Sequence, residues 1–113
     1  MSSRTLAKSA IGFSRMATGT YTGNGAATQA IIGIGFQPKF VIVYRKADAT
    51  YDIGLNRDGT EAKFFDFPVS TWRYETDQIV SLDADGFTVG DGTPLGVNVF
   101  NILATNYTYI AFG

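Results

Sequence analysis

The sequence contains no cysteine and no histidine among its 113 residues. Without cysteine no disulfide can brace the fold, so its stability must come from packing or from assembly. Zinc sites built on these two residue types are excluded, and so are Ser-His-Asp and Cys-His catalytic arrangements. We therefore expect no enzyme activity, no cofactor and no metal centre.

Long apolar runs are also absent. No stretch approaches the roughly 18 consecutive apolar residues of a membrane helix. The segment after Arg4 and Lys8 is interrupted by Ser9, Gly12 and Ser14, so it lacks the continuous apolar region of a signal peptide. We expect a soluble protein made in a cytoplasm, with no membrane partner.

Acidic residues are missing from residues 1–47, whereas residues 48–113 hold ten acids against three cations. The net charge is only −1, but residues 1–47 carry +6 and residues 48–113 carry −7. Either basic and acidic strands neighbour each other in one sheet system, or the two halves form complementary surfaces between subunits. Nucleic acid is not expected as a partner, because Arg45-Lys46 is a lone basic pair in a slightly acidic chain.

Glycine and aromatic residues are plentiful, which favours strands joined by tight turns. Short alternating segments recur at spacings of about ten residues, without a convincing long helix, a pattern typical of an all-β sandwich or jelly roll. We expect one such domain over residues 18–113, preceded by an extended N-terminal arm, residues 1–17. The expected strands cover residues 18–22, 28–34, 36–46, 51–55, 62–67, 78–82, 86–90, 97–103 and 107–112, with a loop at 68–76.

The run from Phe36 to Lys46 is the most strand-like segment and is expected to be the central strand. Because side chains alternate across a strand, Phe40, Ile42 and Tyr44 would share one face and Val41 and Val43 the other. Both faces are apolar, so both need cover. In the next strand we expect Tyr51, Ile53 and Leu55 to face the interior.

Two glycine motifs begin like dinucleotide fingerprints, Gly23-Asn24-Gly25 and Gly33-Ile34-Gly35, but neither ends with the third glycine. We interpret both as turns. Asp83-Ala84-Asp85-Gly86 resembles half of a calcium loop. Two aspartates before a glycine are also what a hairpin turn selects, and an adventitious surface cation is the alternative.

A group of aromatic residues falls around the expected loop. Trp and Tyr on loops are typical of interface anchors and of platforms that stack on sugars, whereas a core or subunit-contact cluster is the alternative. The candidate contact residues are Phe65, Phe67, Trp72 and Tyr74.

The N-terminal arm combines cations with apolar residues and contains no acid. A solvated tail would not need the apolar side chains, and a core strand would alternate, so we expect a tether that orders on a capsid or on a neighbouring subunit. The candidate contact residues are Arg4, Leu6, Lys8, Ile11, Phe13 and Arg15.

The order of several short motifs resembles a family of tailed-phage virion proteins over residues 18–113. In that family a GNG turn, a GF.P..V strand, a DGF.(V/L)G hairpin and a terminal Y.Y.AF strand recur in tail-fibre, receptor-binding and small head proteins. The corresponding segments here are 19–25, 29–31, 35–43, 85–90, Asn98 and 107–113.

The resemblance implies a virion protein without enzyme activity. Because the family segment usually sits inside longer chains, a stand-alone copy with a basic arm suggests a capsid decoration protein, a homotrimer that contacts the major capsid protein or another virion protein. The alternative is a tail-fibre or receptor-binding module that recognises host surface glycan. Either protein would be assembled into the virion in the host cytoplasm.

Overall fold

The computed structural model describes residues 15–47, 50–57, 61–67, 71–74, 78–92 and 99–113, and for residues 46–47, 50–51, 61–67 and 71–74 it describes the backbone alone. No helix in these segments is long and apolar enough to cross a membrane. The described chain forms strands β1 (Met16–Thr22), β2 (Thr28–Ile31), β3 (Phe40–Ala47), β4 (Thr50–Arg57), β5 (Glu61–Phe67), β6 (Thr71–Tyr74), β7 (Ile79–Asp83), β8 (Gly86–Gly90) and β9 (Asn106–Phe112).

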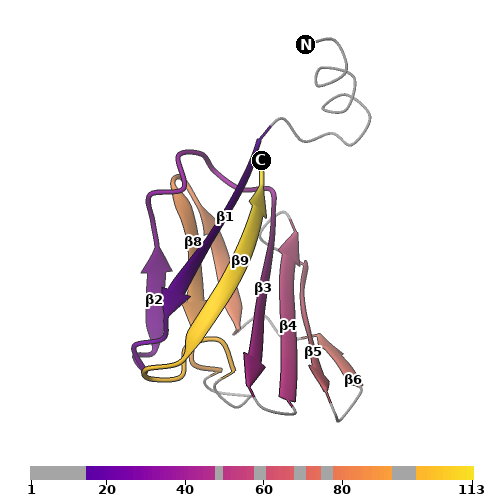
Figure 1. Ribbon diagram of the computed structural model, residues 1–113. Helices are drawn as coiled ribbons and strands as arrows, with labels where there is room; N and C mark the ends of the chain where they lie inside the picture. The colour runs from indigo at the N-terminus through magenta and orange to yellow at the C-terminus, as the bar shows by residue number, and fades with distance from the viewer. Residues whose placement is uncertain (1–14, 48–49, 58–60, 68–70, 75–77, 93–98) are drawn as a thin grey trace.

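The strands form two antiparallel sheets that pack face to face. The larger sheet has the order β1-β9-β3-β4-β5-β6, and the smaller has the order β2-β8-β7 (Figure 1). The ring of Phe87 in β8 meets the rings of Tyr21 in β1 and Tyr109 in β9 edge-on, at 6.2 and 5.2 Å between centroids. These contacts join the layers, so the predicted all-β sandwich is confirmed.

Strand β3 is central, as its sequence predicts, because β9 pairs with one edge and β4 with the other. Val41 and Val43 are fully buried against the smaller sheet. The core also contains side chains from both sheets and from the segment before β9: Tyr21, Ile31, Ile79, Phe87, Val89, Val99, Phe100, Tyr107 and Ala111. Burial of this apolar set is the main force that holds the layers together.

The larger sheet starts earlier than expected. Met16 pairs with Phe112 and Ala17 with Ala111, so both residues belong to β1 rather than to an arm. Residues 1–14 lie outside the described part of the chain.

The expected strand at 97–103 is wrong for residues 99–103, which are irregular. The carbonyl of Val99 accepts a hydrogen bond from the Tyr107 hydroxyl, and the carbonyl of Phe100 accepts one from the Tyr21 hydroxyl. Side chains therefore satisfy backbone groups that a sheet ladder would otherwise pair.

The expected orientation of β4 is also wrong. Asp52, Gly54 and Asn56 face the interior, whereas Ile53 is 38% exposed. A Cβ at Gly54 would lie 2.7 Å from the Phe100 ring, so that ring occupies the space where an inward side chain would be. Side chains alternate across a strand, so Ile53 and Leu55, the neighbours of Gly54, lie on the opposite side of the sheet.

The expected loop at 68–76 contains β6. Its residues Thr71–Tyr74 pair with β5 at the edge of the larger sheet. Three of the four residues in this short segment are β-branched or aromatic, which suits a strand, although the segment lacks clear alternation.

Candidate functional site

One side of the larger sheet points away from the smaller sheet, and no described strand covers it; we call this side the outer face. Strand register places its residues in three cross-strand rows. The residues of each row lie on adjacent strands at hydrogen-bonding distance, so their side chains are neighbours. The rows are Met16–Phe112–Phe40–Arg57, Thr18–Ile110–Ile42–Leu55 and Thr20–Thr108–Tyr44–Ile53.

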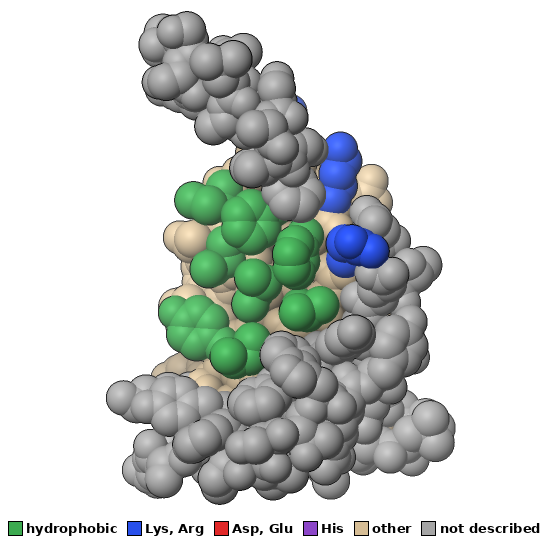
Figure 2. All heavy atoms as spheres, turned by 90° about the vertical axis from the view of Figure 1, so that its right-hand side faces the viewer, with side chains coloured by type: hydrophobic (Ala, Val, Ile, Leu, Met, Phe, Trp, Pro, Cys, Tyr) green, Lys and Arg blue, Asp and Glu red, His purple; other side chains and the backbone are tan. Residues whose placement is uncertain are grey.

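Apolar side chains dominate this outer face. Met16 is 65% exposed, Tyr44 41% and Ile53 38%. The other apolar members are half-buried by their neighbours: Phe40, Ile42, Leu55, Ile110 and Phe112. Figure 2 shows hydrophobic side chains gathered into a continuous patch over this part of the molecule. Exposed apolar patches of this kind are typical of interaction surfaces.

Cross-strand contacts order the side chains of the outer face. The rings of Phe40 and Phe112 lie 5.9 Å apart at an angle of 44°. Ile42 lies between Ile110 and Leu55 in the middle row. Aromatic and β-branched pairs of this kind stabilise a sheet by roughly 0.2 to 1 kcal/mol each. The surface is therefore already ordered in the single chain.

Strand register sets charged residues of both signs along the outer face, because Glu61 of β5 pairs with Arg57 and Lys63 pairs with Leu55. Among the described residues of the three rows the charged member is Arg57, and Lys39 precedes the first residue of β3; both are exposed. Figure 2 shows basic side chains at one border of the apolar patch and no acidic side chain among those drawn in colour.

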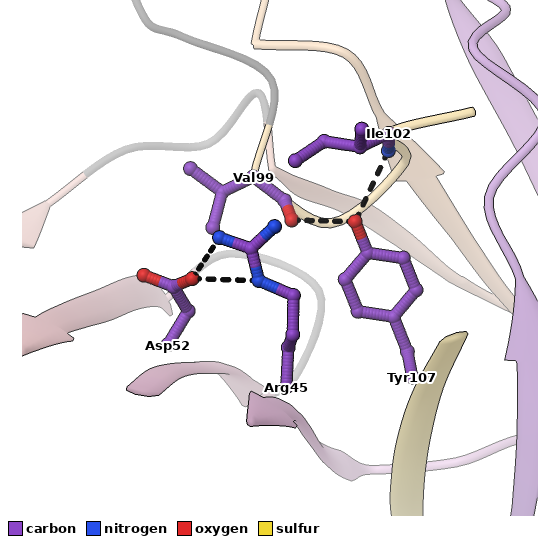
Figure 3. A network of polar contacts seen from close by, with 5 residues as sticks. All are labelled: Arg45, Asp52, Val99, Ile102 and Tyr107. Atoms are coloured by element: carbon purple, nitrogen blue, oxygen red, sulfur yellow. Dashed lines mark hydrogen bonds and ion pairs between the residues drawn. The ribbon is translucent and has the colours of Figure 1, made fainter. Parts of the chain in front are cut away.

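On the face of the larger sheet opposite to the outer face, Arg45 and Asp52 form an ion pair. The Arg45 Nε donates a hydrogen bond of 2.8 Å to Asp52 Oδ2, and its second contact comes from a terminal guanidinium nitrogen. Asp52 is 2% exposed and Arg45 17%. Figure 3 shows the pair beside Tyr107. Each charge satisfies the other, so the pair supports the fold and supplies no free acid or base.

The hydroxyl of Tyr107 is held in the same region. It donates to the Val99 carbonyl at 2.7 Å and accepts from the Ile102 nitrogen at 3.1 Å (Figure 3). Burial raises the pKa of Tyr107, although the Ile102 hydrogen bond and the Arg45 charge act in the opposite direction. Burial also raises the pKa of Tyr21, with a further contribution from Tyr107. Both phenols are therefore kept neutral, as structural groups.

Asp85 connects two of the sequence motifs. Its carboxylate accepts hydrogen bonds from the Gly33 nitrogen at 3.1 Å and the Gly35 nitrogen at 2.7 Å. Both glycines have positive φ, 85° and 96°, which few other residues adopt. The aspartate fixes a glycine turn, and no group of acids in the described residues could hold a metal ion.

The predicted arm contacts are described for Arg15 alone. Its backbone forms two hydrogen bonds with Gly113, and its guanidinium lies 5.9 Å from the centroid of the Phe36 ring. This anchors the start of β1 at the end of the sheet where β9 finishes (Figure 1). The other predicted contacts lie outside the described residues: Arg4, Leu6, Lys8, Ile11 and Phe13.

The predicted aromatic contacts lie on neighbouring strands rather than on a loop. Phe65 and Phe67 belong to β5, and Trp72 and Tyr74 to β6. Phe65 pairs with Ile53 on one side and with Trp72 on the other, which extends the third row of the outer face by register. The side chains of these four residues are outside the described part of the structure.

The sequence prediction missed most of the outer face as a site. Its signal was present as the alternation of Phe40, Ile42 and Tyr44, and again as the alternation of Ile110 and Phe112. The sequence could not show that these two strands lie side by side, or that no second layer of described residues covers this side.

The chain was compared with protein-family models, with curated proteins and with solved structures, and none of the three comparisons gave a match.

Proposed function

We propose that this chain is a structural protein of a bacteriophage virion, and specifically a decoration protein that stabilises the head. The observation that carries the proposal is the outer face, because an ordered apolar sheet surface is buried when a protein assembles. The motif order shared with tailed-phage virion proteins supplies the virion context. The partners are the major capsid protein or another virion protein, together with copies of the chain itself.

The arm and the sandwich have different roles in this proposal. Arg15 is fixed to Gly113 by two backbone hydrogen bonds, so the arm starts at the end of the sheet, next to Met16 and the first row of the outer face. Its cations and apolar side chains would dock on an acidic capsid surface. The outer face would be buried by protein contacts within the assembly.

The copy number and position on particles test the proposal. Virions of the phage that encodes the chain would be purified and examined by quantitative mass spectrometry and cryo-electron microscopy. A decoration protein is expected in proportion to the major capsid protein, with density on the head. A few copies confined to the tail tip would contradict this assignment, and absence from particles would contradict any virion role.

A tail-fibre or receptor-binding module is the second candidate. The backbone pairing of Phe65 with Trp72, next to Ile53, favours it, because aromatic rows on a sheet can stack on sugar rings. Saturable binding to host surface glycan, measured on a glycan array and lost in Trp72→Ala, would support it. The control is Leu103→Ala, at an exposed turn. Phe112→Ala would not serve, because the Phe112 side chain packs on Phe40.

A further inference from the structure

We propose that β1 pairs with β1 of a second copy of this chain, antiparallel and about a twofold axis at Thr18, so that the two larger sheets form one continuous sheet. The contact is a row of backbone groups at the margin of the larger sheet, and it is separate from the outer face. The inference goes beyond the proposed function, because it concerns how the chain meets its own copy and not what the assembly attaches to.

The first argument is the direction of the backbone groups of β1, the end strand of the larger sheet next to β9 (Figure 1). Arg15 and Gly113 exchange two backbone hydrogen bonds, 2.8 and 3.0 Å long, and the register from there to Thr22 is regular. Hydrogen-bonded and non-hydrogen-bonded pairs alternate along an antiparallel ladder, so every second residue of β1 bonds to β9. The residues between them direct their N–H and C=O groups to the margin that no described strand pairs with. We call this row the β1 edge: Met16, Thr18 and Thr20.

Contacts at both ends of β1 agree with this alternation. The Lys39 nitrogen donates to the carbonyl of Phe112, the residue opposite Met16, at 2.7 Å. Phe112 thus directs its carbonyl towards β3 and not towards β1. At the other end the Gly23 nitrogen donates to the Thr105 carbonyl at 2.8 Å, which continues the bonded series from Arg15 in steps of two.

The second argument is that β1 lacks the features that keep the ends of sheets from pairing. Short length, charge, proline and bulges are the usual protection. Of the four end strands in the described sheets, β2 and β6 have four residues each, and the register of β7 shifts between Ile79 and Ser81. Strand β1 has seven residues, a regular register and the sequence MATGTYT, without charge or proline. It is therefore the end strand that is open to another strand.

The third argument selects the register. Thr22 would extend the β1 edge, but its carbonyl already accepts a hydrogen bond of 3.2 Å from the Gln29 side chain. The row that remains has Thr18 at its centre. A twofold axis there pairs Thr18 with Thr18 and Met16 with Thr20 of the second copy, and each pair exchanges two backbone hydrogen bonds. Threonine pairs across strands add to the stability of a sheet.

The fourth argument is charge, which favours the antiparallel direction. Arg15 is the charged residue that adjoins β1 among the described residues. Parallel pairing in register would place the two Arg15 side chains next to each other. The antiparallel register places them six residues apart along the strand, or about 20 Å, which is more than a Debye length.

The pairing also joins the two outer faces. Opposed side chains of an antiparallel pair lie on the same side of the sheet. The Met16 row of one copy therefore continues into the Thr20 row of the other, and the dimer presents one apolar sheet surface of twice the width.

This arrangement predicts a dimer rather than the trimer expected from the sequence. Sedimentation velocity and light scattering over a concentration series up to about 100 μM would measure the mass. The expected species is twice the 12.2 kDa chain, in equilibrium with the monomer. A chain that remains a monomer over the whole series, or that forms a trimer, would overturn the twofold pairing.

Amide hydrogen exchange, followed by NMR above and below the dissociation constant of the dimer, tests the β1 edge in the wild-type chain. The amides of Thr18 and Thr20 should exchange at least about 10-fold more slowly in the dimer than in the monomer. The amides of Ala17 and Gly19 face β9 and should change less. A dimer in which Thr18 and Thr20 exchange as fast as in the monomer would overturn the β1 edge as the contact.

Charge substitutions at Thr18 test the axis. Thr18→Lys and Thr18→Glu each place like charges opposite each other, so each should weaken its own dimer about 10-fold or more. An equimolar mixture of the two should recover an affinity within about 3-fold of wild type at low salt, and less in about 0.5 M salt. A mixture that dimerises no better than either variant alone would overturn the axis at Thr18.

The same pair of substitutions at Thr20 is the matched control for the register. Thr20 lies opposite Met16, and the two copies of Thr20 are about 13 Å apart along the strand. Mixing Thr20→Lys with Thr20→Glu should therefore recover little. Recovery at Thr20 that equals or exceeds recovery at Thr18 would overturn the proposed register.

Val80→Lys in β7 is the control for the position of the contact, because Val80 is 40% exposed on an end strand of the smaller sheet. It should leave the dimer unchanged, and weakening equal to that of Thr18→Lys would overturn the β1 edge. Circular dichroism and cooperative unfolding check that each variant folds. If the Thr18 variants do not fold, amide exchange in the wild-type chain decides the question.

A strand from another protein is the other possible occupant of the β1 edge, and it gives a distinct result. The chain alone would then stay a monomer, and the amides of Thr18 and Thr20 would become protected only when purified particles are added. That result would overturn the pairing with a second copy. It would leave the proposed function standing, because that function is decided by copy number and position on the virion.

Discussion

The hydroxyl of Tyr107 donates a 2.7 Å hydrogen bond to the carbonyl of Val99, eight residues earlier in the chain. The hydroxyl of Tyr21 does the same for the carbonyl of Phe100, also at 2.7 Å. The two tyrosine rings stack with centroids 4.9 Å apart. Two phenols on neighbouring strands thus fasten an irregular segment to the core, in place of a sheet ladder.

The first prediction concerns Tyr107→Phe. Removing the hydroxyl leaves the Val99 carbonyl and the Ile102 nitrogen without this partner, so the free energy of unfolding should fall by about 1 to 3 kcal/mol. Urea denaturation measures the change. Tyr44→Phe, at an exposed position, is the control and should stay within about 0.5 kcal/mol of wild type. Equal effects would mean that the buried hydroxyl does not stabilise the fold.

The second prediction is a loss of stability at alkaline pH. Burial raises the pKa of both Tyr21 and Tyr107 above the ordinary value of 10.0. A phenol is neutral when protonated, so the folded state holds these protons more tightly than the unfolded state. The stabilisation is complete below about pH 10 and is lost as the pH rises from there towards the folded values.

Urea denaturation between about pH 8 and pH 11.5 tests this dependence. The double variant Tyr21→Phe with Tyr107→Phe lacks both phenols, so its stability should decline less steeply above pH 10 than that of the wild type. The same slope in both proteins would assign the alkaline loss to other groups.

Much of the fold could be predicted from local patterns, because β3 and β9 carry β-branched and aromatic residues in clear alternation. The segment at 99–103 could not. Val99 and Phe100 look like strand residues, but their carbonyls accept hydrogen bonds from the hydroxyls of Tyr107 and Tyr21 respectively. Tyr21 is distant in sequence, and Tyr107 lies on β9. A long-range contact overrode the local propensity.

Local sequence patterns also failed to predict the outer face. Phe40, Ile42 and Tyr44 could be assigned to one side of β3, but Ile53 and Leu55 were expected inside. The Phe100 ring lies against Gly54 and reverses the two sides of β4. Without that contact there is no way to know that the apolar residues of β3 and β4 share a surface.

The third prediction concerns the buried ion pair. Asp52→Ala leaves the Arg45 guanidinium largely buried without its carboxylate, so the free energy of unfolding should fall by about 2 to 4 kcal/mol. Thermal and urea denaturation measure it, with the exposed Lys39→Ala as a control that should change little. Replacing both partners, Arg45→Met with Asp52→Leu, should recover part of the loss. A double variant less stable than Asp52→Ala would show that the charges act through other contacts.

The fourth prediction concerns the glycine turn. Asp85→Ala removes the acceptor for the Gly33 and Gly35 nitrogens and should lower the free energy of unfolding by about 1 to 2 kcal/mol. Asp85→Asn keeps one acceptor oxygen, so its loss should be smaller. The neighbouring Ile32→Ala, at a 75% exposed position, is the control. If calorimetry gives Ile32→Ala and Asp85→Ala the same loss of stability, the role of the carboxylate is contradicted.

The last prediction concerns the arm. Deleting residues 1–14 should leave the sandwich folded, because Arg15 and the strands after it keep their pairing with β9. The truncated protein should bind virions more weakly, since Arg4, Lys8 and the apolar side chains between them and Arg15 are the expected contacts. Ordering an arm costs roughly 1 to 2 kcal/mol per residue, so its side chains must contribute enough contact to offset this.

The salt dependence of virion binding distinguishes contacts made by the arm from contacts made by the outer face. Cationic contacts weaken as salt rises, so the intact protein should lose virion binding in about 0.5 M salt, whereas the truncated protein should respond little. Occupancy on purified particles, measured by co-sedimentation, gives both values. The substitution pair Arg4→Ser with Lys8→Ser is a milder version that keeps the length of the chain. If the truncated protein occupies particles as fully as the intact one at both salt concentrations, the arm is dispensable and the attachment surface lies on the sandwich itself.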